Sequence, residues 1–147
     1  MMNRQEAEQF LKKAPVGRLA TVYEGQPYIV PMNFLFHKGK IYFHSKRKGK
    51  KITNLKANER ICFEVDEYKG IIPADKACKF TVRARSVIVF GKANLIEDSQ
   101  EKMKILEKLV EKYSPGVPKP FEESEVHSVI IGEIEIETME GKNKNMD

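Results

Sequence analysis

The chain has 147 residues, of which 41% are hydrophobic and 32% charged, with a formal net charge of +5. This length and composition predict one globular domain, residues 1–147, and argue against a fibrous, disordered or membrane-spanning chain, because no apolar run approaches the roughly 20 residues of a transmembrane helix. The charged N-terminal stretch lacks the apolar segment of a secretory signal, so we expect a cytoplasmic protein with no membrane partner.

Residues 3–13 predict the first helix, with Asn3 as its cap and Glu6 at the capping-box position. Residues 17–45 then form three β-rich runs, separated by turn signals at Glu24-Gly25 and Lys38-Gly39. We interpret these runs as an antiparallel meander.

A short helix is predicted over residues 49–60, because Ile52 and Leu55 fall on one face and Asn58 is suited to end it. Strand-like runs follow at 60–66 and 80–98. Gly91 interrupts the second run and predicts a bend or bulge.

Between those runs, residues 67–79 are expected to form a long connection, which either borders a ligand groove or is simply a surface loop. Residues 98–113 give the clearest helical periodicity, capped by Asp98 or Ser99. Residues 126–137 predict the last strand, and residues 139–147 a frayed polar tail.

Six or seven antiparallel strands with three helices and no βαβ alternation indicate a mainly β (α+β) domain. The architecture that fits best is a small β-barrel with helices packed against it.

The cysteine and histidine residues do not indicate a metal centre. Cys62 and Cys78 are sixteen positions apart without a CxxC motif, and the histidines are scattered. We therefore expect no disulfide and no metal, and two buried or partly buried thiols. A redox-sensitive role for Cys78 stays open.

The run "SKRKGKK", residues 45–51, has three possible interpretations: a solvated turn, a nucleic-acid patch, or a cradle for a compact anion such as phosphate. Lys48, Lys50 and Lys51 fall in or just before the first turn of the predicted helix, where each cation opposes the helix dipole by roughly 0.3–1 kcal/mol. A bound anion would reverse that cost, using the free N–H groups of the first turn and close approach at Gly49.

The phosphate cradle is therefore the favoured interpretation, with the solvated turn second. Nucleic acid ranks last, because the run lacks the interleaved aromatic residues on which single-stranded bases stack, and no DNA-binding or RNA-binding motif occurs elsewhere.

A slot for a flat heterocycle is a second hypothesis, based on the strand-like segment "YIVPMNFLF", residues 28–36. Pro31 removes a ladder hydrogen bond and suggests an edge strand or bulge whose neighbouring backbone groups lack strand partners, while Met32 and Phe34 could supply apolar contacts. A plain edge strand is the simpler alternative. His44 lies between this segment and the basic run, although a lone histidine is more often structural.

The chain carries no nucleophile–base motif, P-loop or dinucleotide motif, so hard chemistry would belong to a bound cofactor. At this point the runs 17–66 and 77–98 together resemble the pyridoxamine 5′-phosphate oxidase-related FMN-binding split-barrel proteins. Within that family the chain is most similar to the nitroimidazole-resistance, nitroreductase-like branch.

The resemblance covers residues 10–138 and implies a six-stranded antiparallel split β-barrel that forms a homodimer, with FMN held at the subunit interface. It implies that Pro31, Met32, Asn33 and Phe34 lie along the flavin ring, that His44 and Ser45 lie near the ring and ribityl chain, and that Lys48, Lys50 and Lys51 bind the phosphate. Arg85, Ser86 and Val87 resemble the strand that closes the site from the other subunit.

The sequence departs from true pyridoxamine-phosphate oxidases, because it has no tryptophan and no C-terminal tryptophan–arginine segment. Vitamin B6 synthesis is therefore not expected. The first hypothesis is an FMN-dependent oxidoreductase that passes electrons from a reduced donor such as NAD(P)H to a small organic acceptor, with a nitroaromatic compound as candidate acceptor and His44 as candidate catalytic residue. The alternative is a non-catalytic flavin, haem or deazaflavin binder or electron carrier.

Overall fold

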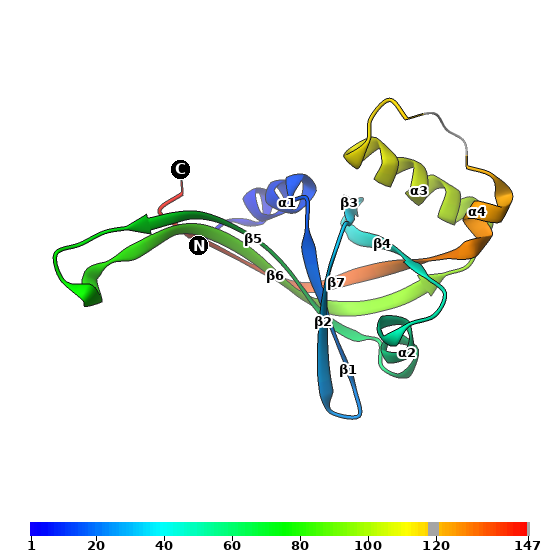
Figure 1. The fold of residues 1–147 in the computed structure, drawn as a ribbon, viewed down its shortest axis with the longest axis horizontal. Helices are drawn as coiled ribbons and strands as arrows, with labels where there is room; N and C mark the ends of the chain where they lie inside the picture. Colours follow the sequence, from blue (N-terminus) through cyan, green and yellow to red (C-terminus); the bar gives the residue numbers. More distant parts are fainter. Residues whose placement is uncertain (118–120, 147) are drawn as a thin grey trace.

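The computed structural model describes residues 1–117 and 121–146, in which the chain forms seven strands and four α-helices around one antiparallel sheet (Figure 1). In chain order the elements are α1 (Arg4–Lys13), β1 (Gly17–Tyr23), β2 (Gln26–Met32), β3 (Leu35–His37), β4 (Lys40–Lys46), α2 (Lys50–Ala57), β5 (Arg60–Ile72), β6 (Thr81–Ile96), α3 (Ser99–Tyr113), α4 (Glu123–Ser128) and β7 (Val129–Lys144). None of the helices in these residues is long and apolar enough to cross a membrane.

The strand order, β2-β1-β5-β6-β7-β4-β3, confirms the expected mainly β split barrel and corrects its details. Both hairpins of the predicted meander are present, β1 with β2 and β3 with β4. Its middle run is not one strand, because β2 and β3 lie at opposite edges of the sheet although only Asn33 and Phe34 separate them in the chain. The three peptide units from Met32 to Leu35 span at most about 10 Å, so the sheet curls until its two edges approach at this link. No ladder joins β2 to β3 within the described residues, and the barrel therefore stays split.

The seventh strand is the three-residue β3, which pairs only with β4. The sequence pattern predicted six or seven strands, and the resemblance implied six. Pro31, as expected for a residue without an N–H, lies in an edge strand, β2.

Helix α1 covers one opening of the barrel. Asn3 caps it as predicted, its side-chain oxygen accepting from the Glu6 N–H at 2.9 Å. Its buried face packs with Phe34, Phe43 and Phe63, which have no exposed surface, and the rings of Phe34 and Phe63 meet edge-on with centroids 5.0 Å apart.

The three longest strands, β5, β6 and β7, form a continuous spine that extends beyond the barrel as an arm (Figure 1). The predicted bulge at Gly91 is present: Phe90 pairs with Thr138 but Gly91 pairs with Ile136, leaving Glu137 as the extra residue. A Cβ at Gly91 would overlap the carbonyl oxygen of Glu135, which explains the glycine.

Two predictions about the arm are wrong. Residues 67–72, expected in a loop, continue β5, and the connection to β6 includes only one turn of 3₁₀ helix, Ala77–Lys79. The tail expected to fray from residue 139 instead continues β7 to Lys144, because it pairs with the first half of β6 and accepts a hydrogen bond from Met2 N–H at Gly141 O (3.0 Å). Residue 147 lies outside the described residues.

Helices α3 and α4 pack together on the opposite end of the sheet from the arm, over a second core that includes Leu106, Leu109, Val126 and Ile131. Asp98 caps α3, its carboxylate accepting from the Glu101 N–H at 3.0 Å. Residues 126–128, predicted as the start of the last strand, belong to α4, because a capping box closed by Glu125 begins a helix there.

Candidate cofactor site

The predicted anion cradle lies at the beginning of α2, which follows β4 directly. Gly49 is the N-cap residue, with a φ of 138° that favours glycine, and no side chain caps this end of the helix. The first turn has no acidic residue and begins with Lys50 and Lys51. The free N–H groups of this turn and the positive end of the dipole therefore face the same place as the ammonium groups.

Among the described residues, Lys48, Lys50 and Lys51 form no ion pair with a carboxylate. The Lys50 ammonium lies over the Tyr28 ring, 5.1 Å from its centroid, and the Lys51 ammonium lies 5.6 Å from the Phe43 centroid. Lys51 is half-buried, and burial lowers the pKa of its ammonium below the ordinary value. The fold thus holds these cations near each other with aromatic rings rather than carboxylates beside them.

The neighbouring cation Arg47 behaves differently. Its Nε donates to His127 O at 2.7 Å, and its guanidinium forms an ion pair with Glu97 at 3.0 Å. Arg47 therefore joins the end of β4 to α4 and to the segment before α3. It was not among the residues predicted to bind phosphate, and its guanidinium is already paired.

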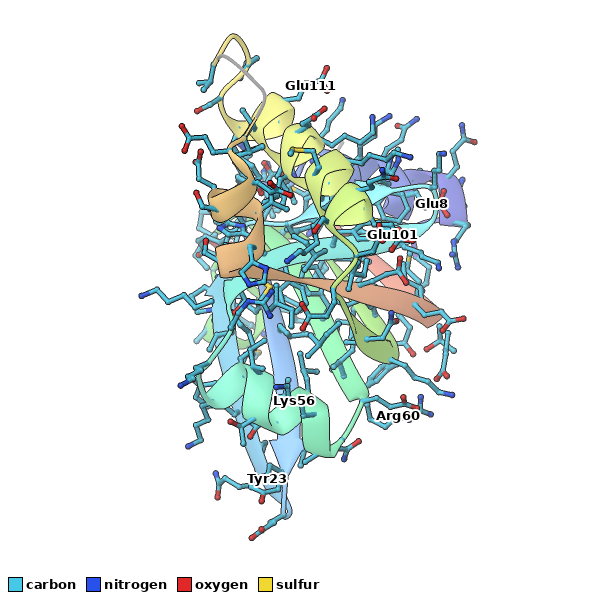
Figure 2. All side chains as sticks on the ribbon, turned by 90° about the vertical axis from the view of Figure 1, so that its right-hand side faces the viewer. Glu8, Tyr23, Lys56, Arg60, Glu101 and Glu111 are labelled. Carbon is cyan, nitrogen blue, oxygen red and sulfur yellow. The ribbon has the colours of Figure 1, made fainter. Side chains whose placement is uncertain are left out.

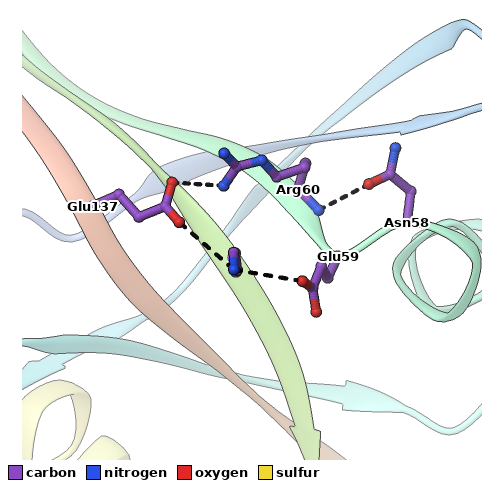
Figure 3. Close-up of polar contacts among 5 residues, drawn as sticks. Asn58, Glu59, Arg60 and Glu137 are labelled. Carbon is purple, nitrogen blue, oxygen red and sulfur yellow. Dashed lines mark hydrogen bonds and ion pairs between the residues drawn. The ribbon is translucent and has the colours of Figure 1, made fainter.

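Several of the cations on the spine are paired with carboxylates (Figure 3). Arg60 contacts Glu137 at 2.5 Å, and Lys92 lies between Glu59 (3.8 Å) and Glu137 (3.9 Å). The Arg60 N–H also donates to the Asn58 side chain at 3.0 Å. Arg60 and Lys92 thus have carboxylate partners, whereas among the described residues no carboxylate lies against the lysines at the start of α2.

A pocket of about 560 Å³ opens above these lysines. We call it the basic groove. Its lining residues come from β2, β4, the link between β4 and α2, α2 itself and the first residue of β7: Tyr28, Val30, His44, Ser45, Lys46, Lys48, Gly49, Lys50, Lys51, Ile52 and Val129. Five residues predicted from the sequence, His44, Ser45, Lys48, Lys50 and Lys51, are thus brought together here.

The end of the molecule that carries this groove is seen in Figure 2, where α2, marked by Lys56, and α3, marked by Glu101 and Glu111, lie on opposite sides of the sheet edge. The volume of the groove is within the range of small-molecule sites, roughly 300–1,000 Å³. The ammonium groups and helix N-terminus fit a phosphate, and the walls formed by Tyr28, Val30 and Val129 fit an apolar body.

His44 lies at the inner end of the groove, on β4. Its imidazole reaches solvent inside the groove, yet the surrounding protein desolvates it and lowers its pKa below the ordinary 6.5, an effect to which the Lys51 charge adds. The imidazole is therefore mainly neutral at pH 7 and can accept a hydrogen bond. Ser45 is buried beside it, and its hydroxyl donates to Lys46 O at 2.9 Å.

A second pocket, of about 440 Å³, adjoins the basic groove and shares His44 and Val129 with it. We call it the apolar pocket. It is lined by Asn33, His44, Leu106, Leu109, Val110, Tyr113, Ser114, Phe121, Glu125, Ser128 and Val129. It lies between α3, α4 and the end of β4, and it was not predicted from the sequence.

The segment predicted to lie along the flavin ring is divided by the fold. Asn33 lines the apolar pocket, Pro31 is exposed, and Met32 packs partly against the core. Phe34 is completely buried, so its side chain is a core residue in this chain. The predicted ring contacts of these four residues stay predictions.

The backbone of Phe34 lies outside both strand ladders, and side chains of α3 bind it instead. Its N–H donates to the Tyr113 hydroxyl at 3.0 Å, and its carbonyl accepts from the Lys112 ammonium at 2.9 Å. The same side chains bind the α1–β1 connection, the Lys112 ammonium donating to Ala14 O (2.8 Å) and the Tyr113 hydroxyl donating to Pro15 O (2.8 Å). The end of α3 therefore fastens the link between the two sheet edges.

Arg85, Ser86 and Val87 lie on β6, outside both pockets. The Arg85 Nε donates to Glu67 at 2.8 Å, its guanidinium lies over the Phe10 ring at 4.2 Å, and Val87 is completely buried. Within one chain these residues do not contribute to the groove, and their contact with a cofactor across a dimer stays a prediction.

Sequence reasoning missed Tyr28, Val30 and Val129 in the groove, and Lys112 and Tyr113 behind it. The alternation of Tyr28 and Val30 along β2 could have placed them on the lysine side of that strand. No local signal marks Lys112, a lysine whose ammonium is half-buried by tertiary packing. The two cysteines are free: Cys62 is half-buried as expected, whereas Cys78 is exposed, contrary to the prediction.

Within residues 1–117 and 121–146, no three metal-ligating side chains gather into a metal site. The chemistry of the groove is thus that of ammonium groups, backbone N–H groups, one imidazole and apolar walls. This donor set matches an anionic organic molecule with a planar part.

Solved structures of other proteins share this fold. A candidate 5-nitroimidazole antibiotic resistance protein from Bacteroides thetaiotaomicron VPI-5482 is 27% identical, with a TM-score of 0.82 over 96% of this chain and 84% of that chain. An FAD-binding protein from Mesorhizobium loti is 26% identical, with a TM-score of 0.67 over 95% and 94% of the two chains. An FAD and haem binding protein from Mycobacterium smegmatis, 19% identical, superposes with a TM-score of 0.90 over 99% of this chain and 73% of that chain.

The family resemblance seen in the sequence is confirmed by comparison with protein families. The family model described as pyridoxamine 5′-phosphate oxidase matches residues 3–143, which include every element from α1 to β7 except the last residue of that strand. The chain therefore belongs to the pyridoxamine 5′-phosphate oxidase family.

Proposed function

We propose that this protein is an FMN-dependent oxidoreductase. The observation that carries the proposal is the group of lysines without carboxylate partners at the uncapped start of α2, inside a groove large enough for a cofactor. Each such cation is unfavourable there unless an anion is bound. Two relatives above 25% identity support a flavin and an organic acceptor, one being named FAD-binding and the other a nitroimidazole resistance protein.

In this proposal Lys48, Lys50 and Lys51 bind the phosphate of FMN together with the first N–H groups of α2. His44 and Ser45 lie next to the ring and ribityl chain. Asn33 and the apolar residues of β2 orient the ring, and the predicted residues Arg85, Ser86 and Val87 would reach the cofactor only from a second copy of the chain in a homodimer.

Bound FMN would supply the redox chemistry, carrying electrons from a reduced donor such as NAD(P)H to a small organic acceptor, for which a nitroaromatic compound is the candidate. The protein would bind and orient the cofactor. The neutral imidazole of His44 can hold or release a proton near the reacting groups, which keeps it as the proposed catalytic residue. A cytoplasmic location is part of this proposal.

The direct test measures binding of FMN and riboflavin to the purified protein by fluorescence titration. We expect FMN to bind at least about 100-fold more tightly, because riboflavin lacks the phosphate and two charge-assisted contacts are worth roughly 3 kcal/mol or more. In Lys50→Glu with Lys51→Glu this preference should disappear. The control is Lys104→Glu with Lys108→Glu, which changes the net charge equally on α3 and should leave it intact. Equal affinities for the two flavins in the unmodified protein would refute the phosphate cradle.

Turnover is tested separately. Oxidation of NAD(P)H by the FMN-loaded protein in the presence of a nitroaromatic acceptor supports the enzyme. FMN binding without such turnover would favour the alternative of a flavin carrier or electron-transfer protein, and a red protein with a Soret band would favour haem. Sedimentation of the FMN-loaded protein as a monomer would remove Arg85, Ser86 and Val87 from the proposed site.

A further inference from the structure

The apolar pocket beside the basic groove has walls of a different chemistry from those of the groove. Leu106, Leu109 and Val110 of α3 form one side, with Phe121 and Val129 nearby. His44 and Val129 belong to both cavities, so a molecule in the apolar pocket would lie against whatever fills the inner end of the groove.

Several polar groups on the walls of this pocket are already bound within the protein. The Tyr113 hydroxyl donates to Pro15 O, the Asn33 side-chain N–H donates to the same carbonyl at 3.2 Å, and the Ser128 hydroxyl donates to Glu125 O at 2.8 Å. Because these donors are satisfied, they present little demand for a polar ligand. The pocket therefore favours an apolar molecule, and its flanking aromatic rings suit a planar one.

The lining also includes two titratable side chains, the His44 imidazole and the Glu125 carboxylate. One Glu125 oxygen accepts from the Glu122 N–H at 3.0 Å in the capping box of α4, which holds the carboxylate in place. The residues that line the pocket include no lysine or arginine. An anionic ligand would lose hydration here and meet a like charge, whereas a neutral or cationic ligand would not.

We propose that the apolar pocket binds the electron acceptor, that this acceptor is a small planar aromatic molecule without negative charge, and that Glu125 selects against anionic analogues. The proposal rests on the proposed function, because the partner across His44 is taken to be FMN. The two cavities then divide the ligands by charge: the groove takes the anionic cofactor and the pocket takes the uncharged acceptor.

The test uses oxidised, FMN-loaded protein without a reductant and measures equilibrium binding of nitrobenzene and 4-nitrobenzoate from changes in the flavin absorption spectrum. The two probes share the ring and nitro group and differ in one carboxylate. We expect nitrobenzene to bind at least about tenfold more tightly. Equal binding, or no binding of nitrobenzene by protein that holds FMN, would overturn the inference while leaving the FMN proposal intact.

Two variants locate the site. Glu125→Gln keeps the capping box, which accepts Gln as well as Glu, and should reduce the preference for nitrobenzene by about threefold through tighter binding of 4-nitrobenzoate. Val110→Phe fills the pocket and should weaken the binding of nitrobenzene by about tenfold, while the affinity for FMN stays unchanged. If Val110→Phe instead releases FMN from protein that remains folded by circular dichroism, the pocket belongs to the cofactor and the inference is wrong.

Discussion

Charged side chains have different neighbours on the spine of β5, β6 and β7 and in the basic groove at α2. On the spine, Arg60 and Lys92 face carboxylates (Figure 3), whereas Lys50 and Lys51 lie over aromatic rings at the positive end of a helix. The spine gains stability from close packing and paired charges. In the groove, the lysines interact unfavourably with the positive end of the α2 dipole. A bound anion would remove this loss of stability.

The largest effect should come from the most tightly packed point of the spine. Gly91→Ala would place a methyl group on the carbonyl oxygen of Glu135, and overpacking against backbone cannot be relieved by a side-chain rotation. We expect a loss of about 3 kcal/mol or more in the free energy of unfolding, measured by urea denaturation.

Gly25→Ala is the matched control for Gly91→Ala. Gly25 has a φ of 76° but open space around its Cβ, so the strain alone should cost only about 1 kcal/mol. Similar losses at the two positions would mean that the bulge relaxes and that the spine is less rigid than its packing indicates.

The features predicted correctly from the sequence are those with local causes. The capping residues Asn3 and Asp98 predict where α1 and α3 begin, and Gly91 predicts the bulge. The sheet order, the length of β7 and the arm could not be predicted in this way. They depend on pairing between segments far apart in the chain, and a polar strand such as residues 138–144 is indistinguishable from a tail until its partner is known.

The same distinction applies to the site. Lys48, Lys50 and Lys51 were identified because a helix beginning is visible in the sequence, and the groove is indeed built around them. The apolar pocket and the support of Phe34 by Tyr113 require two elements 79 residues apart to meet. Only the folded chain reveals that contact.

The second largest effect is expected at the link between the two sheet edges, which the end of α3 holds. Tyr113→Phe removes the hydroxyl that accepts from the Phe34 N–H and donates to Pro15 O. A backbone N–H left without a partner in a partly buried place costs about 1–3 kcal/mol, which thermal or urea unfolding would measure. Tyr68→Phe, on an exposed tyrosine of the arm, is the control and should be neutral. Equal stability of the two variants would show that water replaces the hydroxyl.

Lys112 predicts a pH dependence at the same place. Burial lowers the pKa of its ammonium to about 8, from an ordinary 10.5. Between these values the unfolded chain binds more protons than the folded protein, so stability should rise with pH from about 8 to 10.5. In Lys112→Met this contribution to the slope of the melting temperature against pH should be absent. Identical slopes for both proteins would mean that the Lys112 pKa is not lowered.

Most substitutions destabilise a protein, but in the groove we expect a substitution that stabilises the fold. Without FMN, Lys50→Glu with Lys51→Glu should stabilise the fold by about 1 kcal/mol, because two cations leave the positive end of α2 and two carboxylates replace them. Lys56→Glu, in the last turn of the same helix (Figure 2), should instead destabilise it slightly. Loss of stability in the double variant would show that the lysines support the fold rather than a ligand.

The smallest effect should come from a paired charge on the spine. Arg60 and Glu137 are both well exposed, with 57% and 39% of their side-chain surfaces open to solvent. Exposed pairs contribute about 0.2–1 kcal/mol, so Arg60→Ala and Glu137→Ala should each lower the free energy of unfolding by no more than about 1 kcal/mol, and the double variant should lose less than the sum. FMN affinity should not change in any of them. If these replacements weaken FMN as strongly as changes at Lys50 and Lys51, net charge rather than the geometry at α2 governs binding, and the contrast between spine and groove has no functional meaning.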